Sequence, residues 1–203
     1  MRLPREFYTR NTISVAKDLL GKILVYNDGE TLIKGKIVET EAYLGENDDG
    51  AHFYNGLTYR TRIIDEDGGH IYLYIIYGMY LMFNIVAEKK GVHGAVLLRA
   101  IEPLEGIEKM YFNRYKKPYD NPSMKEILNL TNGPGKLVRA YGITKEFYGV
   151  DLVTDHRIWI EDADNIPEEQ IVKAKRINID YAEIAKDYLL RFYIKDNPFV
   201  SKK

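Results

Sequence analysis

The chain has 203 residues, of which 45% are hydrophobic and 29% are charged, and its formal net charge at pH 7 is −1. This length suits a single globular domain over residues 1–203, which can bury its core without metal or disulfide support. The absence of cysteine excludes disulfides, thiolate metal sites and cysteine nucleophiles, and the near-zero net charge argues mildly against nucleic-acid binding.

The amino-terminal part predicts a short helix and a β-hairpin in a protein that is not exported. The opening MRLPREFYTRN carries charges where a secretory signal needs an apolar run, so we expect a cytoplasmic protein. Apolar residues within 13–20 repeat at helical spacing, and Gly21 follows as a C-terminal cap. Residues 22–26 and 31–43 are rich in β-formers, and the Asn-Asp-Gly at 27–29 suits a hairpin turn.

Two carboxylates lie close together near the end of the second predicted strand. Glu39, Glu41 and Tyr43 share one face because side chains alternate along a strand, so spacing alone does not choose between the two glutamates. A strand-end glutamate is usually a solvated charge, but an aromatic wall can hold a carboxylate where it activates a water. The following loop, residues 45–69, is long enough to suggest a function, and its His52 fits a surface residue, a hydrogen-bond partner or a pocket wall.

An uncharged stretch of 17 residues, 71–87, approaches the length of a membrane span. Its four tyrosines, together with Gly78 and Asn84, favour a buried β-hairpin over a lipid-facing helix. Tyr77 falls at the turn, where a large exposed ring can wedge between stacked bases in the minor groove. The alternative is that the tip residues fold back onto the loop.

The rest of the chain alternates short helices with strands. No regular βαβ succession occurs, so we predict an α+β fold with a central curved, mostly antiparallel, partly barrel-like sheet, peripheral helices and a protruding β-hairpin. We predict strands at residues 94–100, 157–160, 171–179 and 190–194. We predict helices at residues 104–115 and 136–141, and between them a short helix at residues 123–126 with a capping box formed by Ser123 and Glu126.

Several polar features stand out, each with a plain structural alternative. Arg99 and Asn84 lie within apolar runs, where a buried polar group must find partners. Residues 131–137 (TNGPGKL) place backbone amides and Lys136 at a helix start, which suits phosphate binding or simply forms a turn. Residues 109–139 carry seven basic and two acidic side chains, which offer DNA a basic face or belong to solvated loops. Walker, GxGxxG, HExxH and zinc-deaminase motifs are absent, so we expect neither cofactor nor metal.

Five blocks of the sequence match one family in order. The chain resembles the alkyladenine, or 3-methyladenine, DNA glycosylases over nearly its whole length. The resemblance implies a monofunctional base-excision repair enzyme, an N-glycosyl hydrolase that flips a damaged purine from duplex DNA, hydrolyses its bond to deoxyribose and leaves an abasic site. The implied substrates are 3-methyladenine, 7-methylguanine, hypoxanthine and etheno-adenine, without a ranking. The blocks are GKIVETEAYLG (35–45), HIYLYIIYGMYLMFNIV (70–86), AVLLRAIEPLEG (95–106), NGPGKL (132–137) and RFYIKDNPFVS (191–201).

The same resemblance implies roles for three residues around the reacting bond and the DNA backbone. Glu41, the glutamate of the EAY triplet, corresponds to the general base that activates the attacking water, which separates it from Glu39. Arg99 matches an arginine beside that water and the adjacent phosphate. Lys136 is a looser match to a residue that contacts the DNA backbone.

Five further residues correspond to the base pocket and to the inserted side chain. Tyr43, His52 and Tyr74 match the residues that enclose the flipped base, and Tyr77 matches the side chain inserted into the vacated stack. Asn84 corresponds to the asparagine that crowds the 2-amino group of normal guanine. Alkylation at N3 or N7 makes a purine positive, so stacked tyrosines favour the damaged base by cation–π attraction.

The resemblance further implies a monomer that acts on double-stranded DNA containing damaged purines, without metal or membrane, in the cytoplasm or at the nucleoid of a prokaryote. The sequence departs from the family at residues 62–69, where Asp65, Glu66 and Asp67 form an acidic run. This run should weaken attraction to phosphate if the loop approaches DNA. Three alternatives remain open: a non-catalytic nucleic-acid-binding module, an enzyme acting on free nucleosides, and a bifunctional glycosylase that also nicks the backbone.

Overall fold

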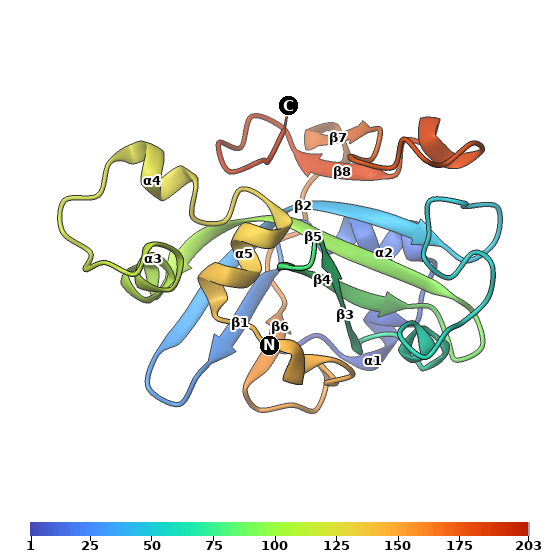
Figure 1. Ribbon diagram of the computed structural model, residues 1–203, viewed down its shortest axis with the longest axis horizontal. Coiled ribbons are helices and arrows are strands. Elements are labelled where there is room, and N and C mark those ends of the chain that lie inside the picture. The colour runs from blue at the N-terminus through green and yellow to red at the C-terminus, as the bar shows by residue number, and fades with distance from the viewer. Residues whose placement is uncertain (203) are drawn as a thin grey trace.

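Eight strands form the central sheet of the computed structural model, which describes residues 1–202 (Figure 1). Along the main path the strand order is β3-β4-β5-β2-β1-β6, while β8 pairs with β2 and carries β7. The pairings are antiparallel, and the path has open ends at β3 and β6, so the described sheet stays open rather than closing into a barrel. The predicted α+β fold is confirmed. The strands are β1 (Ile23–Asn27), β2 (Leu32–Leu44), β3 (Ile71–Ile76), β4 (Tyr80–Ala87), β5 (Gly94–Glu105), β6 (Ile158–Glu161), β7 (Ile171–Ala174) and β8 (Arg191–Ile194).

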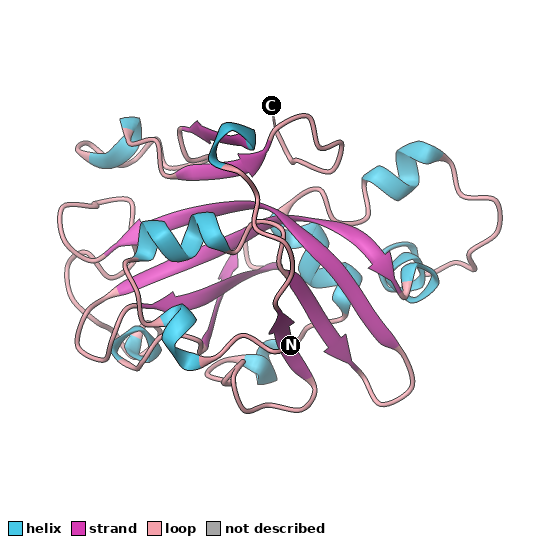
Figure 2. Ribbon diagram, turned by 180° about the vertical axis from the view of Figure 1, so that it is seen from behind, coloured by secondary structure: helices cyan, strands magenta, loops and turns pink. Residues whose placement is uncertain are grey.

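Short helices cover both faces of this sheet. Figures 1 and 2 show α2 on one face and α5 on the opposite face, while α3 and α4 lie beyond the sheet next to α5. The helices within residues 1–202 are α1 (Arg5–Tyr8), α2 (Thr12–Asp18), α3 (Ile107–Tyr115), α4 (Met124–Leu128) and α5 (Pro134–Tyr141), with single 3₁₀ turns at Arg62–Asp65, Lys145–Phe147, Glu168–Gln170 and Ala185–Asp187.

Local sequence signals set where the helices begin. The Asn11 side chain accepts hydrogen bonds from the backbone of the first turn of α2. Ser123 and Glu126 form the predicted capping box of α4. The helix predicted from residue 104 begins instead at Ile107, because β5 continues to Glu105 and Gly106 then adopts a left-handed φ of 73°. This helix is confirmed as an element, and it begins three residues later than predicted.

The uncharged stretch 71–87 forms the β3–β4 hairpin, as predicted. Ile76 accepts a hydrogen bond from the backbone N–H of Met79 at 3.2 Å, which closes a β-turn with Tyr77 and Gly78 at its centre, and the ladder pairs Ile76 with Tyr80. In the part of the chain that the structure describes, no helix is both long and apolar enough to span a membrane. The hairpin interpretation of this stretch is confirmed.

The strand predicted over residues 171–179 is only half formed. β7 ends at Ala174, and the chain then leaves the sheet. Arg176 pairs with the buried Asp48, and the backbone N–H of Ile177 donates to Glu41 at 2.8 Å. The apolar pattern predicted a continuous strand, but these long-range polar contacts direct the segment across the ends of β2 and the following loop instead.

Candidate active site

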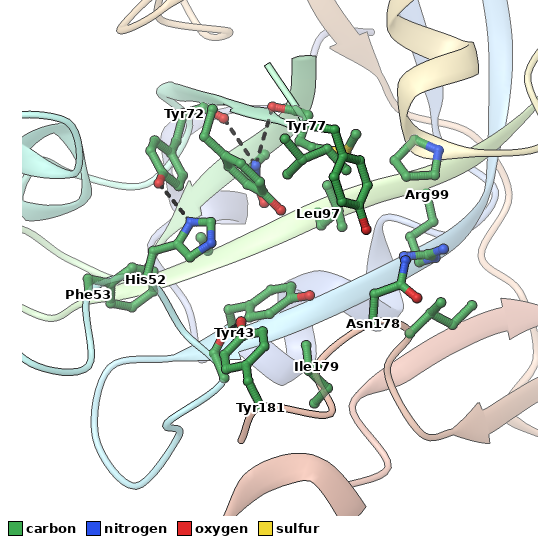
Figure 3. Close-up of a pocket in the computed structure, with 18 residues that line it drawn as sticks. Tyr43, His52, Phe53, Tyr72, Tyr77, Leu97, Arg99, Asn178, Ile179 and Tyr181 are labelled. Carbon is green, nitrogen blue, oxygen red and sulfur yellow. Dashed lines mark hydrogen bonds between the residues drawn. The ribbon is translucent and has the colours of Figure 1, made fainter. Parts of the chain in front are cut away.

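A cavity of about 390 Å³ lies beside the β3–β4 hairpin, within the size range of small-molecule sites. Its walls come from β2, β3, β4 and β5, from the loop after β2, from the first residue of α5 and from residues 177–181 (Figure 3). Segments that are far apart in sequence therefore meet at one space. The residues singled out from sequence that line it are Tyr43, His52, Tyr74, Tyr77, Asn84 and Arg99.

Aromatic side chains form much of the cavity wall. Tyr72 and Tyr74 lie on the same face of β3, with ring centroids 5.6 Å apart. The ring of His52 meets that of Tyr74 edge-on at 4.4 Å, and its Nδ1 shares a 3.1 Å hydrogen bond with the Tyr72 hydroxyl (Figure 3). Tyr43 joins them from β2. Flat aromatic walls of this kind suit a flat aromatic ligand such as a nucleobase.

Burial keeps these aromatic groups uncharged at neutral pH. It raises the pKa of Tyr43 well above its usual range and the pKa of Tyr72 to about 12. His52 retains access to solvent, but partial burial of its ring against the tyrosines lowers its pKa. The imidazole is therefore neutral at pH 7, and the aromatic wall itself carries no positive charge that would repel a cationic base.

Glu41 lies directly behind the cavity wall rather than on it. Its carboxylate is fully buried and accepts hydrogen bonds from the Tyr43 hydroxyl at 2.9 Å, Arg99 Nη1 at 3.4 Å and the Ile177 backbone N–H at 2.8 Å. All three partners line the cavity, whereas Glu41 does not. A carboxylate has about four acceptor positions, so one position of Glu41 remains for a further donor.

The two neighbouring glutamates have different surroundings. Glu39 accepts hydrogen bonds from Arg191 Nη1 at 2.9 Å and from the backbone and hydroxyl of Ser201 at 2.7 and 3.0 Å. It therefore anchors the carboxyl-terminal segment to β2, while Glu41 contacts cavity residues. Within residues 1–202, no three His, Cys, Asp or Glu side chains are grouped so as to hold a metal ion.

Arg99 sits at an irregularity in the β2–β5 ladder. Glu39 pairs with Ala100 and the next β2 residue pairs with Leu98, so Arg99 is passed over. Such bulges often redirect a side chain, and here the guanidinium lies 3.4 Å from both Glu39 and Glu41. Burial opposes its charge, but these carboxylates raise the pKa of Arg99 overall. Because both contacts are long and Nε makes no hydrogen bond within residues 1–202, the group keeps donor capacity.

Asn84 lines the cavity and is held in one orientation. It lies opposite Tyr72 in the β3–β4 ladder, and its Nδ2 donates to the backbone carbonyls of Tyr72 at 3.2 Å and Met82 at 3.4 Å. Two carbonyl acceptors on the same side require the amide nitrogen there. The Asn84 carbonyl oxygen therefore points away from them.

Tyr77 occupies the tip of the hairpin and is 77% exposed. Its φ is +50° and that of Gly78 is +69°, the pattern of a type I′ turn, whose first position normally holds Asn, Asp or Gly. A tyrosine there adopts a left-handed backbone at a cost of about 1–2 kcal/mol. The predicted exposed aromatic tip is found, and backbone strain of this kind is commonly stored at functional sites.

Comparison with known proteins decides the family. The model of the methylpurine-DNA glycosylase family matches residues 6–198. The chain belongs to this family. A relative from Clostridium novyi is 57% identical over 203 residues, which cover 100% of this chain and 99% of the relative, and relatives from Clostridium perfringens and Alkaliphilus oremlandii are each 54% identical over 205 residues, covering both chains completely. All three bear the name "Putative 3-methyladenine DNA glycosylase". The family and the enzyme class predicted from the sequence, a DNA glycosylase, are confirmed.

One part of this glycosylase site was missed in the sequence analysis. Residues 177–179 and Tyr181 line the cavity, and the Tyr181 hydroxyl donates to the Gly50 carbonyl at 2.8 Å. Ile177 supplies a backbone donor to Glu41, which lies 136 residues earlier in the chain. No local pattern marks this segment, because its contacts are almost entirely long-range.

Lys136 stands apart from the cavity of the glycosylase. Its Nζ donates to the side-chain oxygens of Asn129 at 2.9 Å and Asn132 at 2.8 Å. Its neighbour Pro134, at the start of α5, does line the cavity. A lysine ammonium group has three donors, so one donor remains beside these two hydrogen bonds, and a contact between Lys136 and the DNA backbone stays a prediction.

The acidic run that departs from the family pattern is largely paired within the protein. Asp65 lies 3.0 Å from His93 Nε2, and Glu66 lies 3.1 Å from Lys90 Nζ. The Asp67 carboxylate accepts the backbone N–H of Lys90 at 2.9 Å. These contacts reduce the negative potential that the run presents, and a weakening of DNA affinity by this loop stays a prediction.

A second, more open cavity of about 460 Å³ lies beside the first, and Tyr74 lines both. Its rim carries Arg60, Arg62 and Lys145, none of which forms a salt bridge with a residue in the range 1–202. The Arg62 guanidinium stacks 4.1 Å from the ring centroid of the exposed Tyr59. Cations without acidic partners beside the hairpin are suited to phosphate groups.

Proposed function

We propose that this chain excises damaged purines from double-stranded DNA by hydrolysing the N-glycosidic bond, with Glu41 activating the attacking water. The observation that carries the proposal is the aromatic cavity backed by the buried Glu41 carboxylate, beside the exposed ring of Tyr77. A duplex does not fit a cavity of about 390 Å³, so the target nucleotide must leave the stack. Tyr77 then fills the vacated space as a wedge.

The cavity chemistry supports damaged purines as the substrate class. The faces of Tyr43 and Tyr74 attract the positive charge of 3-methyladenine and 7-methylguanine, a contribution of about 0.5–2 kcal/mol. The neutral bases hypoxanthine and etheno-adenine enter by stacking and hydrogen bonding. The Asn84 side chain, fixed by its two hydrogen bonds to the backbone, sterically crowds the 2-amino group of guanine, which disfavours the normal base.

The reaction follows from the arrangement of Glu41 and its neighbours. A water held at the free acceptor position of Glu41 attacks C1′ of the flipped nucleotide, the C1′–N bond breaks, and its electron pair leaves with the purine. Glu41 takes the proton of the water, and its negative charge stabilises the developing positive charge on the sugar. Arg99, with its spare donors, holds the water or the adjacent phosphate. The product is an abasic site.

The lining of the cavity also bears on the reaction type. None of the lining residues within 1–202 is a lysine, so an amine nucleophile for backbone nicking is missing from the wall, which supports a monofunctional enzyme. The main core cluster contains residues from Leu3 to Phe192, which supports one glycosylase domain over residues 1–203. We propose that it acts as a cytoplasmic monomer.

Release of each base from defined duplexes tests this proposal. Oligonucleotides carrying 3-methyladenine, 7-methylguanine, hypoxanthine or etheno-adenine are incubated with the protein, and abasic sites are counted. The proposal requires release from duplex without trapping of a covalent adduct by borohydride. Binding without release would leave a nucleic-acid-binding module, and equal turnover of free nucleosides would leave a nucleoside hydrolase.

A further inference from the structure

A buried ion pair lies behind the stacking tyrosine of the cavity. Arg176 donates to both oxygens of Asp48, at 2.7 and 2.6 Å, and both side chains are fully buried. Arg176 also donates to the Ala42 carbonyl at 3.0 Å, and Asp48 accepts the Leu44 N–H at 2.8 Å. The pair thus binds the peptide groups on both sides of Tyr43 and fixes the backbone from which its ring projects.

The cation of this pair touches the Tyr43 ring itself. The Arg176 guanidinium carbon lies 4.6 Å from the ring centroid. Tyr43 lines the cavity and Arg176 does not, so the guanidinium covers a side of the ring that is turned away from the cavity. A base stacked on the cavity side at about 3.5 Å is then roughly 8 Å from the guanidinium.

The net charge of the pair therefore affects how strongly a charged base binds. At roughly 8 Å inside a protein, one uncompensated unit charge changes the affinity for a charged ligand on the order of tenfold and leaves a neutral ligand nearly unaffected. The other charged groups near this ring are Glu41, which accepts a hydrogen bond from its hydroxyl, and Arg99, which donates to Glu41, and these two oppose each other in sign. Asp48 is the group that offsets Arg176.

We propose that the Arg176–Asp48 pair is a specificity-determining element that keeps the back of Tyr43 electrically neutral, so that one stacking ring accepts both positively charged and neutral damaged bases. The inference rests on the proposed function. With Arg176 uncompensated, the cation behind the ring repels alkylated purines. With Asp48 uncompensated, the anion attracts them and biases the enzyme against neutral lesions.

The test compares kcat/KM for 7-methylguanine, which is positively charged, with kcat/KM for hypoxanthine, which is neutral, in defined duplexes. Asp48→Asn should lower the ratio of the two values about tenfold, and Arg176→Gln should raise it by a similar factor. The double variant Asp48→Asn, Arg176→Gln removes both charges and should restore the wild-type ratio. A purely structural role lowers both rates together, and an unchanged ratio in both single variants would overturn the proposal.

A conservative variant keeps the test decisive if a single charge removal prevents folding. Arg176→Lys retains the positive charge and its partner Asp48 but loses the planar stacking and the two-pronged pairing. The ratio should stay at the wild-type value even where both rates fall, and a shift of several-fold would contradict the proposal. Failure of the proposed function is a separate result, because the wild-type protein would then release neither base.

Discussion

The Tyr43 hydroxyl donates a 2.9 Å hydrogen bond to the Glu41 carboxylate two residues earlier on the same strand. Tyr43 lines the cavity while Glu41 is hidden behind it, so the proposed function gives one side chain two tasks, stacking on the flipped base and holding the general base. The raised pKa of Tyr43, caused by burial, keeps the phenol protonated and therefore a donor at neutral pH. In the proposed mechanism, this contact links base binding to water activation.

Tyr43→Phe should separate these two roles. The ring remains and continues to stack, but Glu41 loses a hydrogen bond to a charged acceptor worth about 1.5–3 kcal/mol. We expect the single-turnover rate on hypoxanthine duplex to fall roughly 10- to 100-fold, with little change in DNA affinity. Tyr74→Phe is the matched control, because no hydrogen bond from the Tyr74 hydroxyl to Glu41 exists; an equal fall in both variants would refute the role of the contact.

Tyr77→Asn should stabilise the folded protein and at the same time lower its base-release activity. Asparagine adopts the left-handed φ of +50° with little strain, so the free energy of unfolding should rise by about 1 kcal/mol. Base release from duplex should fall because the wedge is lost. Thermal unfolding and duplex turnover measure the two effects. Unchanged duplex turnover would remove Tyr77 from the mechanism.

The pH dependence should reflect His52. Its lowered pKa keeps the ring neutral at pH 7, and the ring gains a proton only in solution more acidic than its ordinary value of about 6.5. Release of positively charged 7-methylguanine should then fall relative to neutral hypoxanthine as the pH drops below this value. His52→Gln should flatten the relative profile.

His52 also makes the stability of the folded protein depend on pH, in a direction that follows from its lowered pKa. Because the folded-state pKa of His52 is lowered, the unfolded chain binds the proton first, and stability is lost as the pH falls below about 6.5. Turnover is therefore compared at temperatures below the unfolding range at every pH. If the ratio of 7-methylguanine release to hypoxanthine release changes with pH in the same way in the wild type and in His52→Gln, this ring has no role in base selection.

The rim of the second cavity should contribute to DNA affinity. Arg62→Gln or Lys145→Gln should weaken duplex binding for damaged and undamaged sequences alike, and each should reduce the slope of log K against log salt by about one. Binding measured across a salt series checks this. Lys117→Gln is a suitable control, since Lys117 already forms a 2.6 Å ion pair with Glu126. An unchanged slope would place the DNA elsewhere.

The local sequence pattern alone was sufficient to predict some elements of this fold. The β3–β4 hairpin followed from an uncharged alternating run with a turn at Tyr77 and Gly78, and α4 followed from the Ser123–Glu126 capping box. The hairpin pairs residues no farther apart than Ile71 and Ile85, and the capping box joins residues three apart. A sequence window contains all the information that decides such elements.

Other features of the structure depend on contacts between residues that are far apart in the sequence, so no short sequence window contains both partners. Residues 175–179 read as strand, yet Arg176 pairs with Asp48 and Ile177 with Glu41, both more than 120 residues away. Period-two spacing placed Glu39 and Glu41 on one face of the strand. Only their hydrogen-bond partners show that Glu39 anchors the carboxyl-terminal segment and that Glu41 contacts residues of the cavity. The family resemblance supplied that choice where local physics left it open.

The most direct test of the account is Glu41→Gln on duplexes that contain hypoxanthine or 7-methylguanine. Glutamine keeps the size of the side chain and an acceptor oxygen but does not take up a proton from water. The account predicts that base release is abolished while affinity for the damaged duplex stays within a few-fold of wild type. Release at a rate near that of the wild-type protein would contradict it.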